Sequence, residues 1–523
     1  MLVVEYIVKI LEKSGIHKIF GYQGGNITYL IDAIGRSENI KYVQTYHEQG
    51  AAFAANAYAQ TTENFGVAIS SSGPGAINLI NGIANAFYDS IPCLFITGNI
   101  NSETRRKSNL IRQNGFQETD IVNIVQGITK YATVLDDENY IQIKLEKAIH
   151  CMMEGRKGPV LIDIPHDIQR KEIQVSLSNK KINNVVKENI NKENPIINQI
   201  ISLLETSQRP SILVGGGCRD SFSKNLLCDL LKKVHIPVVS SLCGIDVVPD
   251  YEYYYGMIGS YGHPWSNYIM EHSDLIIVLG SRLDERQCLN PSTFAGKAKV
   301  IRVDIDPVEI ERNIESDINY LGNCKDFLYE LVQLIKTTIK YEYWNKEILC
   351  KKQEQEKLNY YALGENANKI IQQISIQKKS SVICVDVGLH QMAVAQAVKL
   401  KDNTKYLNSC GLGSMGYALP ASIGAAYATN KTKPILCFVG DGGFAMNLQE
   451  LQVIIRDKLP ILIVVINNNK LAMISSYQKL AFEGRVFGSE WGYEALNFKN
   501  IAKCFSLPYQ SINPTDKIKN INI

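Results

Sequence analysis

Short runs of apolar residues alternate with longer amphipathic stretches along the first 169 residues. A short apolar run bounded by glycine or polar residues is typical of a buried strand, and apolar residues recurring at helical spacing are typical of a helix. Regular alternation of the two predicts a parallel sheet with helices on its faces. The predicted strands are 19–21, 42–45, 65–70, 92–97 and 159–164.

The same alternation recurs twice more, which predicts an α/β protein of three domains, each a doubly wound parallel sheet. The first domain covers residues 1–169, the second 196–335 and the third 365–523. Residues 170–195 are rich in Lys and Asn and end in proline, so they are predicted to form a linker. Residues 336–364 are charged with a helical pattern, and we expect them to connect the second and third domains. The remaining predicted strands are 211–214, 237–240, 275–279, 300–304, 382–387, 435–439 and 460–466.

Composition narrows the class of protein. The 523 residues carry 55 Lys plus Arg against 52 Asp plus Glu, a net charge of +3, which argues against nucleic acid as a partner. No apolar run is as long as a membrane span, roughly 20 residues, so no membrane partner is expected. Glu5, Lys9, Glu12 and Lys13 interrupt the apolar N-terminus, which indicates an amphipathic helix and not a secretory signal. A cytoplasmic protein is therefore predicted.

The spacing of the cysteines indicates neither metal-binding pairs nor disulfides. There are 12 of them, and none form a Cys-x-x-Cys pair. Because thiols stay reduced in the cytosol, the sequence predicts neither a zinc site nor a disulfide framework.

Polar residues end two neighbouring predicted strands in the third domain. Gly440-Asp441-Gly442 follows strand 435–439, and Asn467-Asn468-Asn469 follows strand 460–466. The carboxyl ends of neighbouring parallel strands meet at one edge of a sheet, and a carboxylate with an amide carbonyl is a ligand set that suits Mg²⁺. Glycines at this edge would let backbone N–H groups approach a diphosphate. A lone Gly-Asp-Gly is more often a tight turn, but the paired asparagines favour the metal site.

A second motif, His47-Glu48-Gln49-Gly50-Ala51, follows strand 42–45 at the start of a predicted helix. A glutamate at this position usually does no more than complement the positive end of the helix dipole. The whole string, in one chain with the Gly-Asp-Gly motif, favours a catalytic carboxyl.

Together the two motifs resemble the thiamine diphosphate enzymes, whose cofactor motif is Gly-Asp-Gly followed at a distance by Asn-Asn. The resemblance implies that the side chains of Asp441 and Asn468 and the backbone carbonyl of Lys470 hold Mg²⁺. It also implies that Glu48 contacts N1′ of the aminopyrimidine and promotes proton removal from the thiazolium C2. Such a carboxyl must be held in a low dielectric, so that its proton is shared.

Other residues match the family's cofactor loops. Pro74 and Asn78 lie in a loop of the pyrimidine side, and Met415 lies in a Gly-rich loop whose apolar residue keeps the cofactor bent. The alternative for Met415 is ordinary packing. The cofactor-binding residues implied are Pro74, Asn78, Gly388, His390, Gly413, Met415, Gly442 and Gly443.

Within the family the chain is most similar to acetolactate (acetohydroxyacid) synthase, on motifs that include 116–119, 158–165 and 446–451. This implies that Gln117 is a catalytic residue near the reacting carbonyl. Tyr477 stands where Trp is common and Asn26 where Ala is usual, so a more polar acceptor stays open. The substrate residues implied are Gly25, Asn26, Phe116, Arg286 and Tyr477.

Two further expectations concern the middle and the end of the chain. Synthases of this subgroup bind FAD in the middle domain, and Gly215–Gly217, Arg282 and Asp304 are compatible with it. The glycines do not spell Gly-x-Gly-x-x-Gly, so FAD stays open. The subgroup continues beyond Tyr509 with another helix and strand, so the third domain is expected to be truncated at its C-terminus.

The expected function is decarboxylation of a 2-oxo acid, with pyruvate as first candidate, and ligation to a second carbonyl to give acetolactate, a step of branched-chain amino acid biosynthesis. The cofactor would lie between the first domain of one subunit and the third of another, so a homodimer or homotetramer is expected, and a regulatory subunit stays open. One alternative is another thiamine-dependent decarboxylase or carboligase with a more polar acceptor. The other is an inactive binding or assembly protein that keeps the fold.

Overall fold

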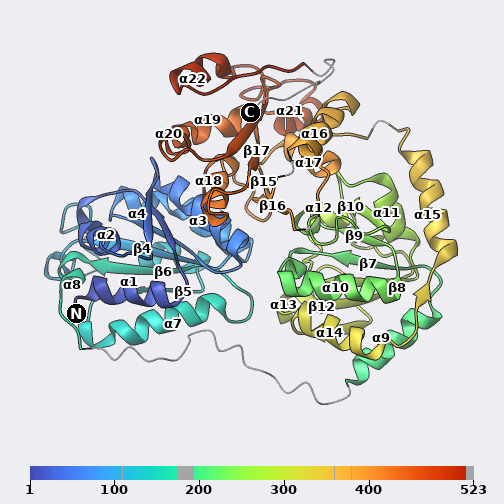
Figure 1. Ribbon diagram of the computed structural model, residues 1–523, viewed down its shortest axis with the longest axis horizontal. Helices are drawn as coiled ribbons and strands as arrows, with labels where there is room; N and C mark the ends of the chain where they lie inside the picture. Colours follow the sequence, from blue (N-terminus) through green and yellow to red (C-terminus); the bar gives the residue numbers. More distant parts are fainter. Residues whose placement is uncertain (109, 175–193, 359, 379, 402, 514–523) are drawn as a thin grey trace.

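The computed structural model contains three parallel α/β sheets in sequence order, as Figure 1 shows. It describes residues 1–108, 110–174, 194–358, 360–378, 380–401 and 403–513. The prediction of an α/β fold with parallel sheets in separate domains is confirmed. Most of the predicted linker, residues 175–193, and the last residues, 514–523, lie outside the described part of the chain.

The N-terminal sheet has six parallel strands in the order β2-β1-β3-β4-β6-β5. Its inner strands are buried along their whole length, as continuous apolar sequences require when helices cover both faces. The strands are β1 Lys18–Gly21, β2 Lys41–Gln44, β3 Gly66–Ser70, β4 Cys93–Asn99, β5 Tyr131–Val134 and β6 Val160–Pro165. The helices are α1 Val3–Lys13, α2 Thr28–Gly35, α3 Glu48–Thr62, α4 Pro74–Asn78, α5 Ile80–Tyr88, α6 Ile121–Val125, α7 Ile141–Met153 and α8 His166–Gln169.

The central sheet also has six parallel strands, in the order β10-β9-β7-β11-β12-β13. The predicted connector contains α15 Glu342–Gln355, which packs on this domain with Trp344 and Ile348 in its core. The strands are β7 Pro210–Val214, β9 Val238–Ser240, β10 Tyr254–Met257, β11 Leu275–Leu279, β12 Lys299–Asp304 and β13 Ile318–Leu321, with β8 Val234–His235 paired to β14 Ile339–Lys340. The other helices are α9 Pro195–Thr206, α10 Ser221–Lys233, α11 Pro264–His272, α12 Glu285–Cys288, α13 Pro307–Ile310 and α14 Cys324–Leu334.

The C-terminal sheet has four described strands in the order β16-β15-β17-β18. Among the described residues β18 lies at the edge and is half-buried, although it is the most apolar of the four. The strands are β15 Val382–Val385, β16 Lys405–Asn408, β17 Ile435–Gly440 and β18 Ile461–Ile466. The helices are α16 Glu365–Gln377, α17 Leu389–Ala397, α18 Ala418–Ala428, α19 Asp441–Met446, α20 Leu451–Arg456, α21 Ala472–Ala481 and α22 Phe498–Cys504.

The N- and C-terminal domains share one hydrophobic core, formed where α3 packs against α18 (Figure 1). The helices approach closely because small residues face each other, and a Cβ added to Gly424 would lie 2.0 Å from the Ala54 carbonyl oxygen. Most of the central domain packs into a separate core. The two terminal domains therefore form one packed body, to which the central domain is attached.

The predicted strands are present, each within two residues of its predicted bounds at either end. Sequence analysis did not predict the edge strands β5, β10, β13 and β16, nor the short pair β8 and β14. Strand β5 is half-buried throughout, β10 and β13 mix buried with more exposed positions, and β16 is buried at all but its first residue. Within the described residues, no helix is long and apolar enough to cross a membrane.

Candidate active site

The Glu48 carboxyl lies over the Gly-rich loop that precedes α4. Glu48 is the first residue of α3, whose N-cap His47 accepts a hydrogen bond from the Gln49 N–H through its ring. The Asn78 side-chain amide donates to Glu48 Oε2 at 3.0 Å, and a Cβ added to Gly75 would lie 3.0 Å from Glu48 Oε1. Pro74 is the first residue of α4, which places it in the same loop. The structure thus brings Glu48, Pro74 and Asn78 together.

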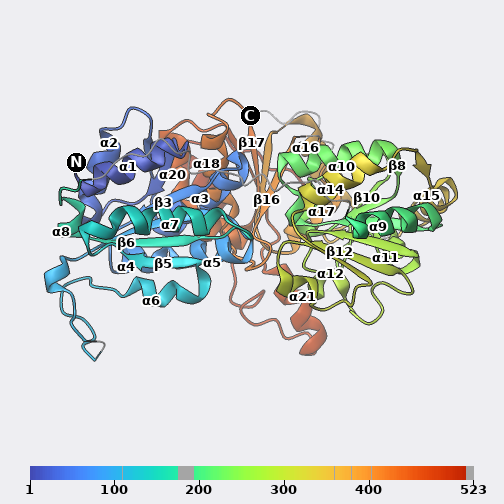
Figure 2. The ribbon, with the colours of Figure 1, turned by 90° about the horizontal axis from the view of Figure 1, so that it is seen from below.

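Gln117 reaches the other side of this loop. A Cβ added to Gly73 would lie 3.0 Å from the Gln117 Cβ, and Gln117 itself has a left-handed φ of 64°. Glu118 holds this conformation, because its buried carboxylate accepts the backbone N–H groups of Arg106 and Asn114, both at 2.7 Å. Phe116 is 85% exposed on the same segment, which extends away from the domain in Figure 2.

Asn26 is fixed beside the same loop. Its side-chain amide donates to Ser72 Oγ at 2.5 Å, and its carbonyl oxygen accepts from the Gln169 side chain at 2.7 Å. A Cβ on Gly98 would lie 1.9 Å from that carbonyl oxygen, so β4 needs glycine there. Gly25 has open space where a side chain would be. The amide N–H of Asn26 therefore has its acceptor, the Ser72 hydroxyl, within the protein.

Asp441 begins α19 at the carboxyl end of β17, and one of its two carboxylate oxygens has no hydrogen-bond partner among the described residues. Oδ1 accepts the Gly442 N–H at 2.8 Å, whereas Oδ2 is buried and makes no hydrogen bond within the described residues. Burial, and then the charge of Asp441 and a side-chain hydrogen bond to its carboxylate, raises the pKa of Tyr493 to about 12. A buried anionic oxygen without a donor is costly, and a cation would satisfy it. These groups fit Mg²⁺.

Asn468 and Lys470 follow the neighbouring strand. The register pairs Gly440 with Ile466, so Asp441 and Asn468 leave adjacent strand ends. Asn468 Oδ1 accepts the Lys470 N–H at 3.3 Å, and Lys470 Nζ pairs with Glu490 at 3.5 Å. The ammonium of Lys470 is therefore directed to a carboxylate. Among the described residues no three His, Cys, Asp or Glu side chains form a metal cluster, so the implied set depends on amide and backbone oxygens.

His390 and two glycines shape the end of β17. The His390 Nε2 accepts the Gly440 N–H at 3.1 Å, and burial lowers the pKa of His390 to about 4, so the ring is neutral. Gly388, at the start of α17, has a φ of 149°, and a Cβ there would lie 2.9 Å from the His390 ring. A Cβ on Gly443 would lie 2.5 Å from Asp386 Oδ1. Glycine at both positions therefore leaves room for the His390 ring and the Asp386 carboxylate.

Met415 lies against the start of α19. A Cβ added to Gly442 would lie 3.2 Å from Met415 Cε. The loop is held by Asp386, which accepts the Gly416 and Ala418 N–H groups at 2.9 and 2.8 Å and whose pKa burial raises to about 6. Gly413 has a left-handed φ of 71° in the same loop. Met415 and Gly413 therefore join Gly442 at this end of the sheet, and Asp386 is a positioning residue that sequence analysis did not find.

Arg286 and Tyr477 border the C-terminal half of the site. Arg286 on α12 has Nη2 3.9 Å from the Met392 sulfur on α17, so it faces the C-terminal domain. Tyr477 lies on α21 with 64% of its surface exposed. No hydrogen bond or ion pair of the described residues links the side chains of Glu48 or Gln117 to Asp441 or Met415. We call the residues around Glu48 and those around Asp441 the two half-sites.

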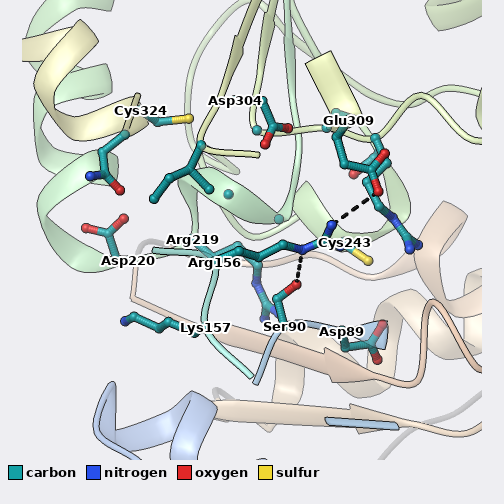
Figure 3. Close-up of a pocket in the computed structure, with 18 of the residues that line it drawn as sticks. Asp89, Ser90, Arg156, Lys157, Arg219, Asp220, Cys243, Asp304, Glu309 and Cys324 are labelled. Atoms are coloured by element: carbon teal, nitrogen blue, oxygen red, sulfur yellow. Dashed lines mark hydrogen bonds and ion pairs between the residues drawn. The ribbon is translucent and has the colours of Figure 1, made fainter. Parts of the chain in front are cut away.

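A cavity of about 2090 Å³ lies between the N-terminal and central domains, at the carboxyl ends of β7, β11 and β12, and Met392 and Cys410 of the C-terminal domain also line it. Its lining includes Gly216, Arg282 and Asp304. Figure 3 shows Arg156 reaching across it, with its guanidinium bonded to Ser90 at 2.9 Å and to Glu309 at 3.2 Å. The outer glycines of Gly215–Gly217 pack on Gly280, but Gly216 meets only Cys243, at 3.4 Å.

The expectation of no disulfide is wrong for one pair. The structure joins Cys243 of the central domain to Cys410 of the C-terminal domain, with Cα atoms 6.6 Å apart. The two lie 167 residues apart in sequence, so their spacing carries no signal for the pair.

Comparison with known proteins matches one family over three successive parts of the chain. Residues 1–124 match the family model for the N-terminal TPP binding domain of thiamine pyrophosphate enzymes, residues 197–331 the central domain, and residues 386–521 the C-terminal TPP binding domain. The acetolactate synthase large subunit of Lactococcus lactis subsp. lactis (strain IL1403) is 33% identical, over 99% of this chain and 90% of that protein. The acetolactate synthase isozyme 2 large subunit of Escherichia coli (strain K12) is 32% identical, over 98% and 91%. The chloroplastic acetolactate synthase of Arabidopsis thaliana is 34% identical, over 91% and 71%.

Proposed function

The chain belongs to the thiamine pyrophosphate enzymes, and we propose that it decarboxylates pyruvate and joins the remaining two-carbon unit to a second 2-oxo acid, forming acetolactate. The observation that carries the proposal is the Glu48 carboxyl, held by Asn78 over the Gly-rich loop with Gln117 at the other side of that loop. The names of the relatives, which are similar over nearly the whole chain, support this reaction.

Each residue has a defined task in this proposal. Glu48 holds a proton at N1′ of the aminopyrimidine, and Asn78 orients the carboxyl by its hydrogen bond. Asp441 and Asn468, with the carbonyl of Lys470, hold Mg²⁺ against the diphosphate. Thiamine diphosphate, when bound, takes up the electron pair left when CO₂ departs. Arg286 supplies a positive charge for the carboxylate of the second substrate.

Incubation of the protein with pyruvate, thiamine diphosphate and Mg²⁺ tests the proposal. We expect pyruvate to be consumed with release of CO₂ and formation of acetolactate, identified by mass. The amide N–H of Asn26 is bonded to Ser72, but its side-chain oxygen, which accepts hydrogen bonds, favours a second candidate, a carboligase with a more polar acceptor. The same incubation with hydroxylated aldehydes added decides between them, because a polar acceptor would divert the product. A protein that binds the cofactor but forms neither product would contradict both.

We propose that the active unit is at least a homodimer, in which Glu48 of one chain faces Asp441 of the other. Large apolar side chains are exposed around both half-sites, among them Phe116, Tyr477 and Leu480, which is 89% exposed. A second copy that covers these side chains would also complete the site. The two half-sites of one chain would then belong to different active sites.

Mixing two inactive variants tests this arrangement. We expect co-expressed Glu48→Ala and Asp441→Asn chains to recover about a quarter of the unmodified activity, because half of the dimers are mixed and each has one intact site. Each variant alone is the control. If the site lay within one chain, the mixture would stay as inactive as the two variants, and sedimentation of the active species as a monomer would contradict the dimer itself.

We also propose that the cavity between the N-terminal and central domains binds FAD. Its size, the open backbone at Gly216 and the carboxylate of Asp304 at the end of β12 fit a dinucleotide. The purified protein is expected to show the visible absorption bands of oxidised flavin, with FAD released on denaturation. Arg282→Ala should lower the flavin content. A colourless protein that takes up no flavin when incubated with FAD would refute this.

A further inference from the structure

Glu450 is a fully buried carboxyl of the C-terminal domain that contacts the N-terminal domain. It ends the 3₁₀ turn Leu448–Glu450, which follows α19, and none of its surface is exposed. Sequence analysis included it in the motif 446–451 without a role. The only hint in the sequence is a charged residue within an apolar helical stretch, where burial requires a partner.

The partner of Glu450 is the start of helix α3. The Tyr46 N–H donates to Glu450 Oε1 at 3.1 Å and also lies 3.3 Å from Oε2. A Cβ added to Gly50 would lie 2.5 Å from Oε1, so the first turn of α3 packs directly on this carboxyl. On the next helix, Arg456 Nη2 donates to the Gln44 carbonyl oxygen at 2.8 Å. The C-terminal domain thus contacts the chain both before Glu48, at Gln44 and Tyr46, and after it, at Gly50.

The chemistry of these contacts explains why the residue is a carboxylate. Tyr46 precedes the N-cap residue His47, so its N–H has no partner within the helix, and the helix dipole makes this end of α3 positive. A carboxylate therefore satisfies the free N–H and complements the dipole. Burial raises the pKa of Glu450 to about 7, against the backbone N–H groups of Tyr46 and His47, the charge of Arg456 and the Gln449 side chain, which lower it.

We propose that Glu450 is a positioning residue for the reaction: it fixes the Tyr46–Gly50 turn so that the Glu48 carboxyl lies against Asn78 and the Gly-rich loop. The inference rests on the proposed function, because it concerns the geometry of the catalytic carboxyl. Among the described residues, Glu450 contacts the backbone of this turn and makes no hydrogen bond to the Glu48 side chain. Its loss should therefore affect proton transfer more than cofactor binding.

The test measures the exchange of the C2 proton of bound thiamine diphosphate with D₂O, which depends on Glu48 and not on any acceptor. Glu450→Ala is expected to slow exchange about 30-fold, because Tyr46 N–H loses its acceptor and the turn is free to shift. Glu450→Gln keeps an acceptor oxygen but loses the charge, so we expect exchange about 5-fold slower. Glu63→Gln is the matched control: Glu63 caps the other end of α3 and bonds Lys405 and Ser221, and its variant should stay within about twofold.

Calorimetry on the same proteins separates the possible outcomes. Cofactor affinity of the Glu450 variants should remain within about threefold of the unmodified protein, as expected when the half-site of Asp441 is intact. Exchange in Glu450→Ala as fast as in Glu63→Gln would overturn the inference. If Glu450→Ala does not fold, Glu450→Gln decides, and exchange equal to the control would overturn it too. An unmodified protein that binds no cofactor would instead refute the proposed function.

Discussion

Replacing Glu48 with alanine is expected to lower pyruvate consumption by about 10³-fold or more, because the proton at N1′ then has no carboxyl to share it. The side chain contributes little to packing, since its bonded partner is the Asn78 amide at the edge of an open loop. The variant should therefore fold and still bind the cofactor through the Asp441 half-site. Steady-state kinetics, circular dichroism and calorimetry on the same preparation measure the three quantities.

Two variants sharpen this result. Glu48→Gln keeps the volume of the side chain and an oxygen that accepts from Asn78, yet it cannot take a proton, so it should be nearly as inactive as Glu48→Ala. Asn78→Ala leaves the carboxyl but removes its orienting bond, and an intermediate loss of about 10-fold is expected. Turnover of Glu48→Gln near the unmodified rate would show that Glu48 is not the catalytic carboxyl.

Replacing Asp441 with asparagine is expected to weaken Mg²⁺-dependent binding of thiamine diphosphate by about 100-fold or more, since a charged ligand is worth at least two powers of ten in affinity. The buried Oδ2 has no donor among the described residues, so without metal the carboxylate is a cost to the folded state. We therefore expect the variant to be at least as stable as the unmodified protein in EDTA. With Mg²⁺ and cofactor, only the unmodified protein should gain thermal stability.

Comparing the stability of the unmodified protein with that of Asp441→Asn distinguishes a metal ligand from a residue with a structural partner. Calorimetry and thermal unfolding, each with and without Mg²⁺, give the four values required. A variant less stable than the unmodified protein even in EDTA would mean that Asp441 has a structural partner. Absence of any effect of Mg²⁺ and thiamine diphosphate on the unmodified chain would favour the inactive binding protein over an enzyme.

Local sequence was enough to predict the sheets and the half-sites for a physical reason. Buried parallel strands must be continuously apolar, and the loops at their carboxyl ends carry polar residues, so β17 followed by Asp441 can be recognised in the sequence. Strand β18, followed by Asn468, is equally apolar in sequence although it is half-buried here. Glu48 can be recognised in the same way, since a charged residue after an apolar strand marks a helix start. Edge strands such as β5 and β10 lack this signal because neither is buried along its whole length.

The contacts that support these residues could not be predicted, because they join distant parts of the chain. Asn26 meets Ser72, and Glu450 meets Tyr46, through folding alone. The sequence suggested that the Asn26 amide needs a polar substrate, whereas the structure gives it a hydroxyl of the protein. What remains for an acceptor is the oxygen of that amide, which accepts hydrogen bonds and therefore favours donors such as hydroxyl groups.

The core shared by α3 and α18 has a consequence for how the chain is made. On the ribosome the N-terminal residues emerge first, but the alanine-rich face of α3 stays without its partner until the whole central domain and then α18 have been synthesised. Contacts between such distant segments form slowly, and the exposed apolar face favours aggregation meanwhile. The first third of the chain expressed alone is therefore expected to be poorly soluble, whereas adding the last third in trans should recover it. The N-terminal domain is therefore synthesised first, but it reaches its final packing only after α18 of the C-terminal domain has been made.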